Sequence, residues 1–270
     1  MTRRTWTAAA FLFCSGTAAL VYQTVWFREF RLIFGASTFA TAAVLAIFMG
    51  GLGAGSAILG KRADASAAPL RFYGTLEICI AISAAVSPVL LWIVRALYIA
   101  LGGSVTLGLA LATIVRLILA TIVLAIPTFL MGGTLPAAAR AVETSDDTGR
   151  RHVALLYGMN TLGAVTGTLL STFYMLERWG NRNTLLAAAV LNVTIGILAR
   201  VVPASGRPSE GRRDGGTTPK PILIASAIVG FSFLLMELVW YRLLTPILGG
   251  TTFTFGLILA IALFGIGLGG

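Results

Sequence analysis

The sequence predicts an all-α protein, a polytopic transmembrane helical bundle of about eight helices. Hydrophobic residues make up 57% of the 270 residues and charged residues only 11%, whereas a soluble domain needs about a quarter charged residues to cover its surface. Long apolar runs, each of about the 20 residues that cross the hydrocarbon layer, alternate with short polar segments. A two-helix unit near the start of the chain also returns near its end. We therefore expect lipid to be the main solvent of this chain.

The apolar runs give the expected elements in order. At about 20 residues a crossing, the predicted helices span 6–30, 38–59, 70–94, 112–136, 153–175, 183–202, 222–244 and 252 to the end. Residues 95–111 are too mixed to cross alone, and we expect them to extend the third helix along the interface with a turn at Gly102–Gly103. In the fourth helix, Pro127 should introduce a kink and Pro136 should mark the end.

An internal repeat divides the chain. Residues 16–56 and 230–270 are identical at about 15 of 41 aligned positions, and both copies carry a Trp-aromatic-Arg motif, at 26–28 and at 240–242. A repeated two-helix membrane unit indicates a duplicated bundle, as in secondary transporters. The predicted parts are therefore a first six-helix repeat (1–202), a polar cytoplasmic linker (203–219) and the first two helices of a truncated second repeat (220–270). We expect the chain to be one and a third repeats of something larger.

Lysine and arginine in the connections predict the orientation. By helix order, thirteen lie on the side of the N-terminus and six or seven on the other side, so the N-terminus and the linker should be cytoplasmic. Because six helices precede the second copy, the two copies insert in the same direction, as parallel repeats like the two halves of major-facilitator transporters. The net charge of +10 then reflects orientation signals and contacts with anionic lipid, and the bilayer rather than nucleic acid is the expected partner.

Polar side chains at membrane depth are the candidates for function, because burying a charge in lipid costs a few kcal/mol. The candidate cavity or inter-repeat residues are Gln23, Arg28, Glu29, Glu77, Asn160, Glu237 and Arg242. Gln23 and Glu237 occupy equivalent positions of the two copies, and hydrogen bonds between helices from these side chains would fix the packing of the two halves. Glu77 lies within two turns of the cytoplasmic face, where it can snorkel or pair with Arg71.

The arginines of the repeated motifs have two interpretations. Either Arg28 and Arg242 snorkel from an interfacial aromatic belt formed with Trp26 and Trp240, or they surround a cavity between the halves. Arg116 is expected at the outer start of the fourth helix with its head among the headgroups.

Small residues predict where helices approach closely. Three small-xxx-small pairs serve either tight packing or sliding contacts in a rocking transporter; they are Gly51 with Gly55, Gly163 with Gly167, and Gly265 with Gly269. The single histidine and the two separate cysteines predict no metal site. The sequence contains no phosphate-binding loop or nucleophile motif, so we expect no catalytic residue and no cofactor in this chain.

Several segments resemble a known family along essentially the whole chain, in order. They are AALVYQTVWFREFRLIFGAST, FMGGLGAGS, PLRFYGTLE, IPTFLMGGTLPAAAR and LLYGMNTLGAVTGTLLS, and they resemble the membrane region of the bacterial fused spermidine synthase-like proteins. The resemblance implies an inner-membrane, major-facilitator-like segment that precedes a cytosolic polyamine aminopropyltransferase-like domain, downstream or separate. That domain's residues match no position here, so the resemblance assigns no catalytic residue.

Three functions follow from these observations. The first is the membrane domain of such a fused protein, with a transporter-like bundle of unknown ligand. The second is a stand-alone major-facilitator-like secondary transporter, and the third is a membrane anchor for a cytosolic enzyme. A water-accessible cavity around Gln23, Asn160 and Glu237 would favour transport, whereas a dry bundle would favour an anchor. A downstream Gly-rich cofactor loop would favour the fused enzyme.

Overall fold

The computed structural model describes residues 3–35, 38–143, 151–202 and 220–269, and the predicted linker at 203–219 lies outside them. These described residues are almost entirely helical and contain no strand. Six of their helical runs are long and apolar enough to cross a bilayer, namely Arg3–Phe34, Thr41–Asp64, Pro69–Ala100, Gly103–Val142, Arg151–Val201 and Ala227–Leu248. The all-helical class and the membrane character are thus as the sequence predicts.

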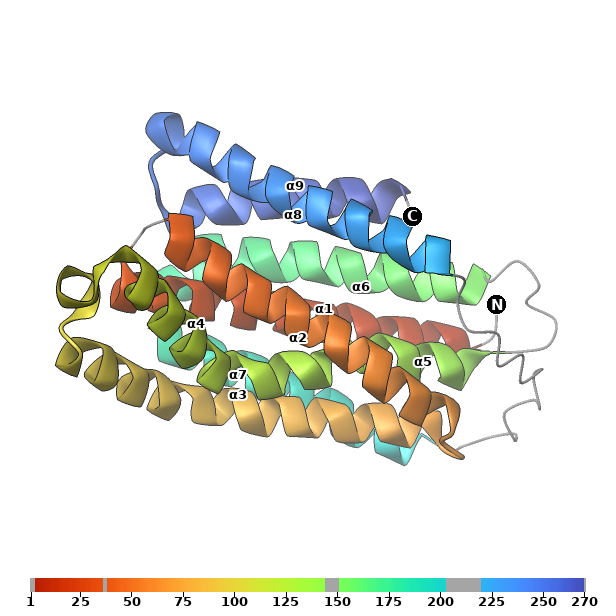
Figure 1. Cartoon of the computed structure of the whole chain (residues 1–270). Helices are drawn as coiled ribbons and strands as arrows, with labels where there is room; N and C mark the ends of the chain where they lie inside the picture. The colour runs from red at the N-terminus through yellow and green to blue at the C-terminus, as the bar shows by residue number, and fades with distance from the viewer. Residues whose placement is uncertain (1–2, 36–37, 144–150, 203–219, 270) are drawn as a thin grey trace.

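The helices lie along one long axis, and the chain runs back and forth along it (Figure 1). In chain order they are α1 (Arg3–Phe34), α2 (Thr38–Asp64), α3 (Pro69–Ala100), α4 (Gly103–Gly132), α5 (Thr134–Val142), α6 (Arg151–Leu170), the π-helical segment η1 (Ser171–Met175), α7 (Leu176–Val201), α8 (Lys220–Leu248) and α9 (Thr252–Gly269). α1 packs along α6, α2 along α4, and α3 along α7. α8 and α9 lie beside this group, with α9 against α6.

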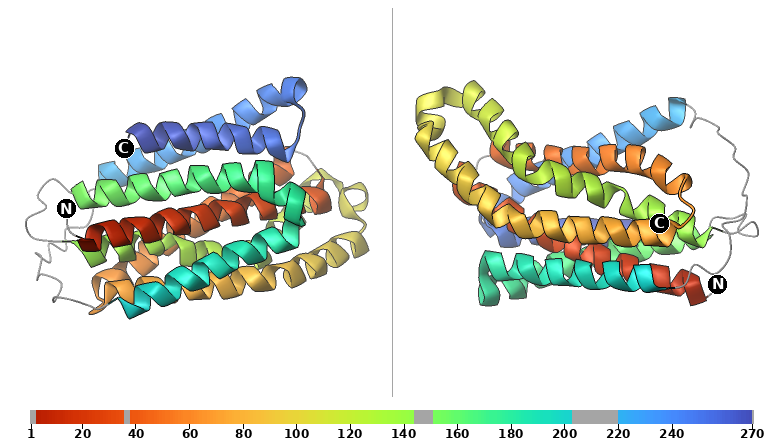
Figure 2. Two further views of the ribbon diagram at one scale, coloured as in Figure 1. Left: turned by 180° about the vertical axis from the view of Figure 1, so that it is seen from behind. Right: turned by 90° about the horizontal axis from the view of Figure 1, so that it is seen from below.

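Four connections meet at one end of the bundle, which we call the glycine end. They are the α1–α2, α3–α4 and α8–α9 connections and the reversal at Gly180, near the start of α7 (Figure 2). Each contains a glycine with positive φ: Gly35 (85°), Gly102 (78°), Gly180 (68°) and Gly249 (82°). Glycine adopts this left-handed backbone freely because it has no Cβ. The turn predicted at Gly102–Gly103 is present, and the N-terminus lies at the opposite end, the N-terminal end.

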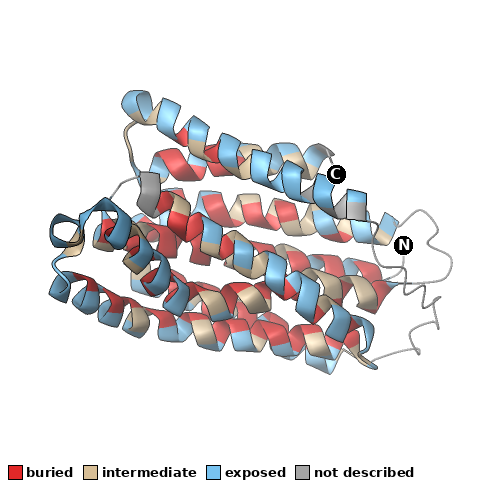
Figure 3. Ribbon diagram, viewed as in Figure 1, coloured by how far each residue is buried: buried red, intermediate tan, exposed pale blue. Residues whose placement is uncertain are grey.

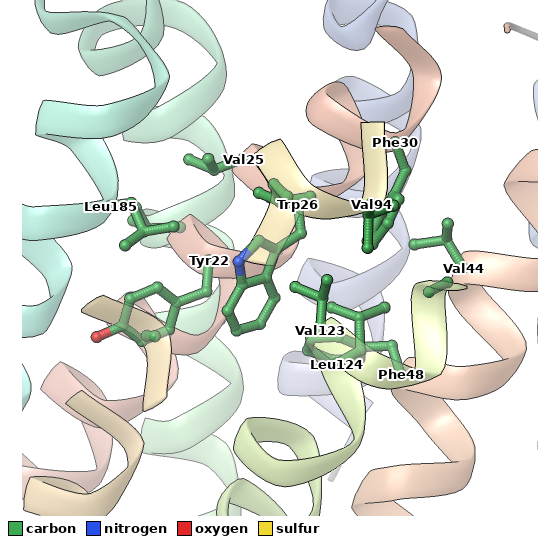
Figure 4. Close-up of a cluster of buried hydrophobic side chains, with 14 of the residues drawn as sticks. Tyr22, Val25, Trp26, Phe30, Val44, Phe48, Val94, Val123, Leu124 and Leu185 are labelled. Carbon is green, nitrogen blue, oxygen red and sulfur yellow. The ribbon is translucent and has the colours of Figure 1, made fainter. Parts of the chain in front are cut away.

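α1 is the central helix of the bundle, whereas α8 is peripheral. In the most apolar stretch of α1, 61% of the residues are buried, against 11% in α8 (Figure 3). The largest fully buried side chain is Trp26 of α1, which packs among apolar residues from α1, α2, α3, α4 and α7 (Figure 4). The first helix of the first copy, α1, is therefore surrounded by protein, whereas its equivalent in the second copy, α8, is mostly exposed.

The contact between α1 and α6 depends on two of the predicted packing glycines. A Cβ built at Gly163 would overlap the backbone carbonyl of Phe13, and one built at Gly167 would overlap that of Thr17. The Thr17 hydroxyl also donates to the carbonyl of Gly163 over 3.1 Å. The two backbones therefore touch directly, which is the arrangement that small-xxx-small pairs permit in membrane helices.

α2 approaches α4 in the same way. A Cβ at Gly51 would overlap the side chain of Thr128, and one at Gly55 would overlap the carbonyl of Phe129. These two glycines therefore let α2 lie flat against the segment of α4 that follows Pro127, a residue that is buried inside that helix.

The third pair behaves differently, and one close contact was not foreseen. Gly265 of α9 has open space where its Cβ would be, and the surroundings of Gly269 lie outside the described residues. Instead, α3 and α7 cross where Gly74 meets Gly196, each in contact with the other's backbone carbonyl. These two glycines are single and so carry no small-xxx-small pattern.

The prediction that Pro136 ends the fourth helix is wrong. α4 stops at Gly132 and the chain resumes helix as α5, which runs to Val142 with Pro136 as its third residue. The first residues of a helix have no intrahelical partner for their N–H groups, so a proline there removes no hydrogen bond. α4 also begins earlier than expected, at Gly103, and is interrupted at Gly108, where φ is 68°.

Candidate functional site

Aromatic rings hold the α8–α9 pair against the rest of the bundle. Phe27 of α1 stacks on Phe255 of α9 with centroids 4.0 Å apart, and Tyr241 of α8 meets the same Phe255 edge-on at 5.9 Å. Offset-stacked and edge-on pairs of this kind are the favoured aromatic geometries. Phe27 and Tyr241 occupy the same position in the two copies of the repeat, so equivalent residues of the two copies contact one ring, that of Phe255.

Arg31 joins this aromatic contact at the glycine end. Its guanidinium lies 5.4 Å from the ring centroid of Phe27 and 5.8 Å from that of Tyr241, distances at which a cation is attracted to an aromatic face. Its Nη2 atom donates to the backbone carbonyl of Gly250 in the α8–α9 connection. Sequence reasoning missed Arg31 as a site residue, because its repeat-equivalent is Thr245 and no motif marks it.

A cavity of about 510 Å³ opens beside this contact. Its lining comes from the end of α1, from η1 and the start of α7, and from the start of α9: Arg28, Arg31, Leu32, Thr172, Leu176, Glu177, Thr251, Thr252 and Phe253. Of the predicted cavity residues, only Arg28 lies here. We call this space the α1–α9 cavity.

Gln23 and Glu237 lie deeper and do not form the expected hydrogen bonds between the halves. They are 3% and 1% exposed. In the described part of the chain, Nε2 of Gln23 and both carboxylate oxygens of Glu237 have no hydrogen-bond partner. The backbone of α8 approaches α9 and α2 but not α1, and the α8 side chain of Tyr241 meets α1 at Arg31. The distance between the two backbones explains why the predicted bonds are absent. Leaving a buried polar group without a partner lowers the stability of the fold by about 1–3 kcal/mol. A ligand or water that bonds to these two side chains would remove this loss.

Glu77 is not the snorkelling residue that the sequence predicted. It is fully buried between α1 and α3 and accepts a 2.6 Å hydrogen bond from the Ser15 hydroxyl. Tyr73, one turn earlier on α3, lies beside the same carboxyl group. Arg71, which the sequence suggested as a partner of Glu77, is exposed. The helix periodicity places Glu77 on the inner face of α3, and no feature of the sequence shows that Ser15 faces it.

We expect Glu77→Ala to lower the free energy of unfolding by about 2–5 kcal/mol, because it leaves a cavity and removes the acceptor of the Ser15 hydroxyl. Glu77→Gln keeps both volume and acceptor, so its loss should stay near 1 kcal/mol. Thermal and denaturant unfolding of the purified chain in a mild detergent measure both changes. Equal losses in the two variants would contradict this role.

Glu29 lines a second, smaller cavity of about 180 Å³ at the glycine end. The amide of Asn181 donates to its Oε1, and Arg95 and Arg182 line the same space. This cavity lies between α1, α3 and α7, away from the α8–α9 pair, so the structure does not bring Glu29 to the contact between the two copies.

The two remaining candidates, Asn160 and Arg242, also lie away from the α1–α9 cavity. Asn160 is half-buried on α6, where its backbone carbonyl faces Gly16. Arg242 is exposed on α8 and lines neither of these two cavities. The structure therefore does not place Arg242 beside its repeat-equivalent Arg28.

The aromatic-belt interpretation fails for the first copy. Trp26 is fully buried and donates from its indole nitrogen to the Ser87 hydroxyl over 2.8 Å, whereas Trp240 is 40% exposed.

Arg116 is not at the headgroup level that we expected for it. It is 4% exposed, and its Nε donates to the hydroxyl of Tyr98 over 3.1 Å. The reason is that the helix resumes directly after the interruption at Gly108, so that Arg116 lies about two turns inside it and faces Tyr98 of α3. Among the described residues, no group of three or more histidine, cysteine or acidic side chains could hold a metal ion.

Comparisons with protein-family models, with curated proteins and with solved structures find no match.

Proposed function

We propose that this protein is a transporter-like membrane bundle that holds a ligand where residues 220–269 meet residues 3–202. The observation that carries the proposal is the α1–α9 cavity of about 510 Å³, in the size range of small-molecule sites. Two buried polar side chains without partners, Gln23 and Glu237, lie deeper in the two copies that form this contact. Buried polar groups at membrane depth typically mark a substrate path.

The connections of the two copies support the parallel, major-facilitator-like repeat. α1–α2 and α8–α9 both run to the glycine end and back, and both turn at a left-handed glycine, Gly35 with φ 85° and Gly249 with φ 82°. Counting α4 with α5 and dividing the helical run Arg151–Val201 at Gly180, we propose eight crossings, six before the linker and two after it.

We further propose that the N-terminal end is cytoplasmic. Lys61 and Arg62 at the end of α2, Arg140 in α5 and Arg200 in α7 all lie at that end, as the positive-inside rule requires of the cytoplasmic face. The location is then a bacterial inner membrane, as in the fused spermidine synthase-like proteins that the sequence resembles. An aminopropyltransferase-like domain, downstream or separate, would be the cytosolic partner, and this chain would supply no catalytic residue.

The main alternative is a dry membrane anchor, and thiol labelling separates the two. In a chain with Cys14 and Cys79 replaced by alanine, we expect Thr172→Cys and Glu237→Cys to react with a membrane-impermeant thiol reagent, since a transport path contains water. Ala84→Cys on α3, fully buried in the core, is the matched control. If positions 172 and 237 react no faster than position 84 in the folded protein, the bundle is dry and the anchor function replaces the transporter.

A further inference from the structure

We propose that the α1–α9 cavity binds an amphipathic organic anion, a molecule that carries a carboxylate or phosphate group beside an apolar part. The inference rests on the proposed function because it assigns a ligand class to the same contact. The positive charge of the cavity, its unpartnered donors and its apolar lining support this ligand class.

The charge of the cavity is positive. Arg28 and Arg31 line it together with one acidic residue, Glu177. In the described part of the chain, neither arginine forms an ion pair with a carboxylate, Glu177 included. Two guanidinium groups in a partly enclosed space attract a carboxylate or phosphate more strongly than either does in water. A polycation would meet two like charges and one opposite charge, which disfavours a polyamine here.

Arg31 is held in position before any ligand arrives. The carbonyl of Gly250 and the rings of Phe27 and Tyr241 fix its guanidinium. Its Nη1 atom is nevertheless buried without a hydrogen-bond partner in the described residues. A fixed cation with a free donor is preorganised for an anionic oxygen, which lowers the entropy lost on binding.

Thr172 supplies a second free donor. It is 1% exposed, lines the cavity and has an Oγ1 atom without a hydrogen-bond partner among the described residues. Its place on the π-helical segment η1 brings it against Gly256 of α9, where a Cβ would overlap that hydroxyl. The missing side chain at Gly256 thus leaves room for this hydroxyl between η1 and α9, beside the cavity.

The start of α9 adds a third favourable element. The Thr251 hydroxyl accepts from the N–H of Thr254 over 3.3 Å and caps the helix, which leaves the N–H groups of Thr252 and Phe253 for another acceptor. Both of these residues line the cavity. The N-terminus of an 18-residue helix carries a partial positive charge that favours anions.

The apolar part of the lining consists of Leu32, Leu176 and Phe253. Such a lining suits the hydrocarbon part of a ligand and not a small hydrated inorganic ion. Two sources can supply this chemistry: a soluble organic anion, or the phosphate headgroup of an anionic lipid, since the cavity lies at the end of the bundle.

Phenyl phosphate is the probe for the soluble source, measured by calorimetry on the full chain in phosphatidylcholine nanodiscs. We expect it to bind, and we expect Arg28→Gln to weaken binding by about tenfold or more, since a charge-assisted hydrogen bond is lost. Thr172→Val, which keeps the volume, should weaken binding less, by about threefold to tenfold. Arg242→Gln removes the same charge from the equivalent position of the second copy and should change nothing.

A second experiment tests whether the ligand is a lipid. If phenyl phosphate fails to bind but phosphatidylglycerol is retained on the purified chain by native mass spectrometry, and Arg28→Gln abolishes that retention, a lipid headgroup occupies the cavity. The proposal is overturned if neither probe binds, or if binding is the same in Arg28→Gln, Thr172→Val and Arg242→Gln. The thiol labelling described above needs no ligand, so failure of this inference is distinguishable from failure of the proposed function.

Discussion

Trp26→Ala is expected to destabilise the bundle by about 3–5 kcal/mol, the range for deleting a fully buried large aromatic side chain. Trp26 is completely buried, stacks on Tyr22 with centroids 5.4 Å apart and donates to Ser87. Lipid tails are as apolar as the protein interior, so the loss comes from van der Waals contacts and the hydrogen bond rather than from hydration. Denaturant unfolding in detergent, followed by circular dichroism, measures the change.

The repeat provides the matched control. Trp240→Ala deletes the same atoms at the equivalent position, where the side chain is 40% exposed, and should cost less than about 1 kcal/mol. Trp26→Phe keeps most of the volume and isolates the hydrogen bond to Ser87, worth about 1 kcal/mol. Similar losses for the two alanine variants would mean that the two copies have equivalent surroundings, contrary to the structure.

A leucine at Gly163 is expected to separate α1 from α6. Overpacking a core costs about 1–3 kcal/mol and occasionally more, and here the obstacle is the backbone carbonyl of Phe13, which cannot rotate away as a side chain can. We expect Gly163→Leu to exceed that range and to lower the yield of monodisperse protein. Size-exclusion chromatography and the thermal unfolding midpoint in detergent measure the effect.

Gly265→Leu is the control for this substitution. It belongs to the same type of small-xxx-small pair, but the space beside Gly265 is open, so its unfolding midpoint should match that of the unmodified chain. A large loss for Gly265→Leu together with a small one for Gly163→Leu would show that α9, and not α6, makes the close contact.

Much of the fold is predictable because lipid imposes simple rules. Apolar length predicted the helices, and the double glycine predicted the turn at Gly102–Gly103. Two small-xxx-small pairs predicted close helix contacts at Gly163 and Gly167 and at Gly51 and Gly55, and the structure supplies their partners, α1 and α4. Each of these features depends on residues that are close in sequence, which is why the sequence pattern alone predicts it.

The candidate site was less predictable, because burial depends on partners that are distant in sequence. Trp26 and Trp240 occupy equivalent positions of similar segments, yet Trp26 is fully buried by other helices and Trp240 is 40% exposed. Arg116 could not be assigned to the interior without knowing that Tyr98 of α3 faces it. Arg31 and Thr172 converge on one cavity from segments that are more than 130 residues apart, and no motif links them.

The contrast in burial between α1 and α8 has a consequence for the surroundings of the protein. In α1, 61% of the most apolar stretch is buried against other helices. In α8 only 11% is buried, so in a bilayer most of its surface would contact lipid. Tyr241 of α8 nevertheless contacts Arg31 and Phe255 beside the cavity. Bilayer thickness and lateral pressure act on a helix through its exposed face. We therefore expect the lipid composition of the membrane to act, through α8, on the contact of Tyr241 with Arg31 beside the cavity.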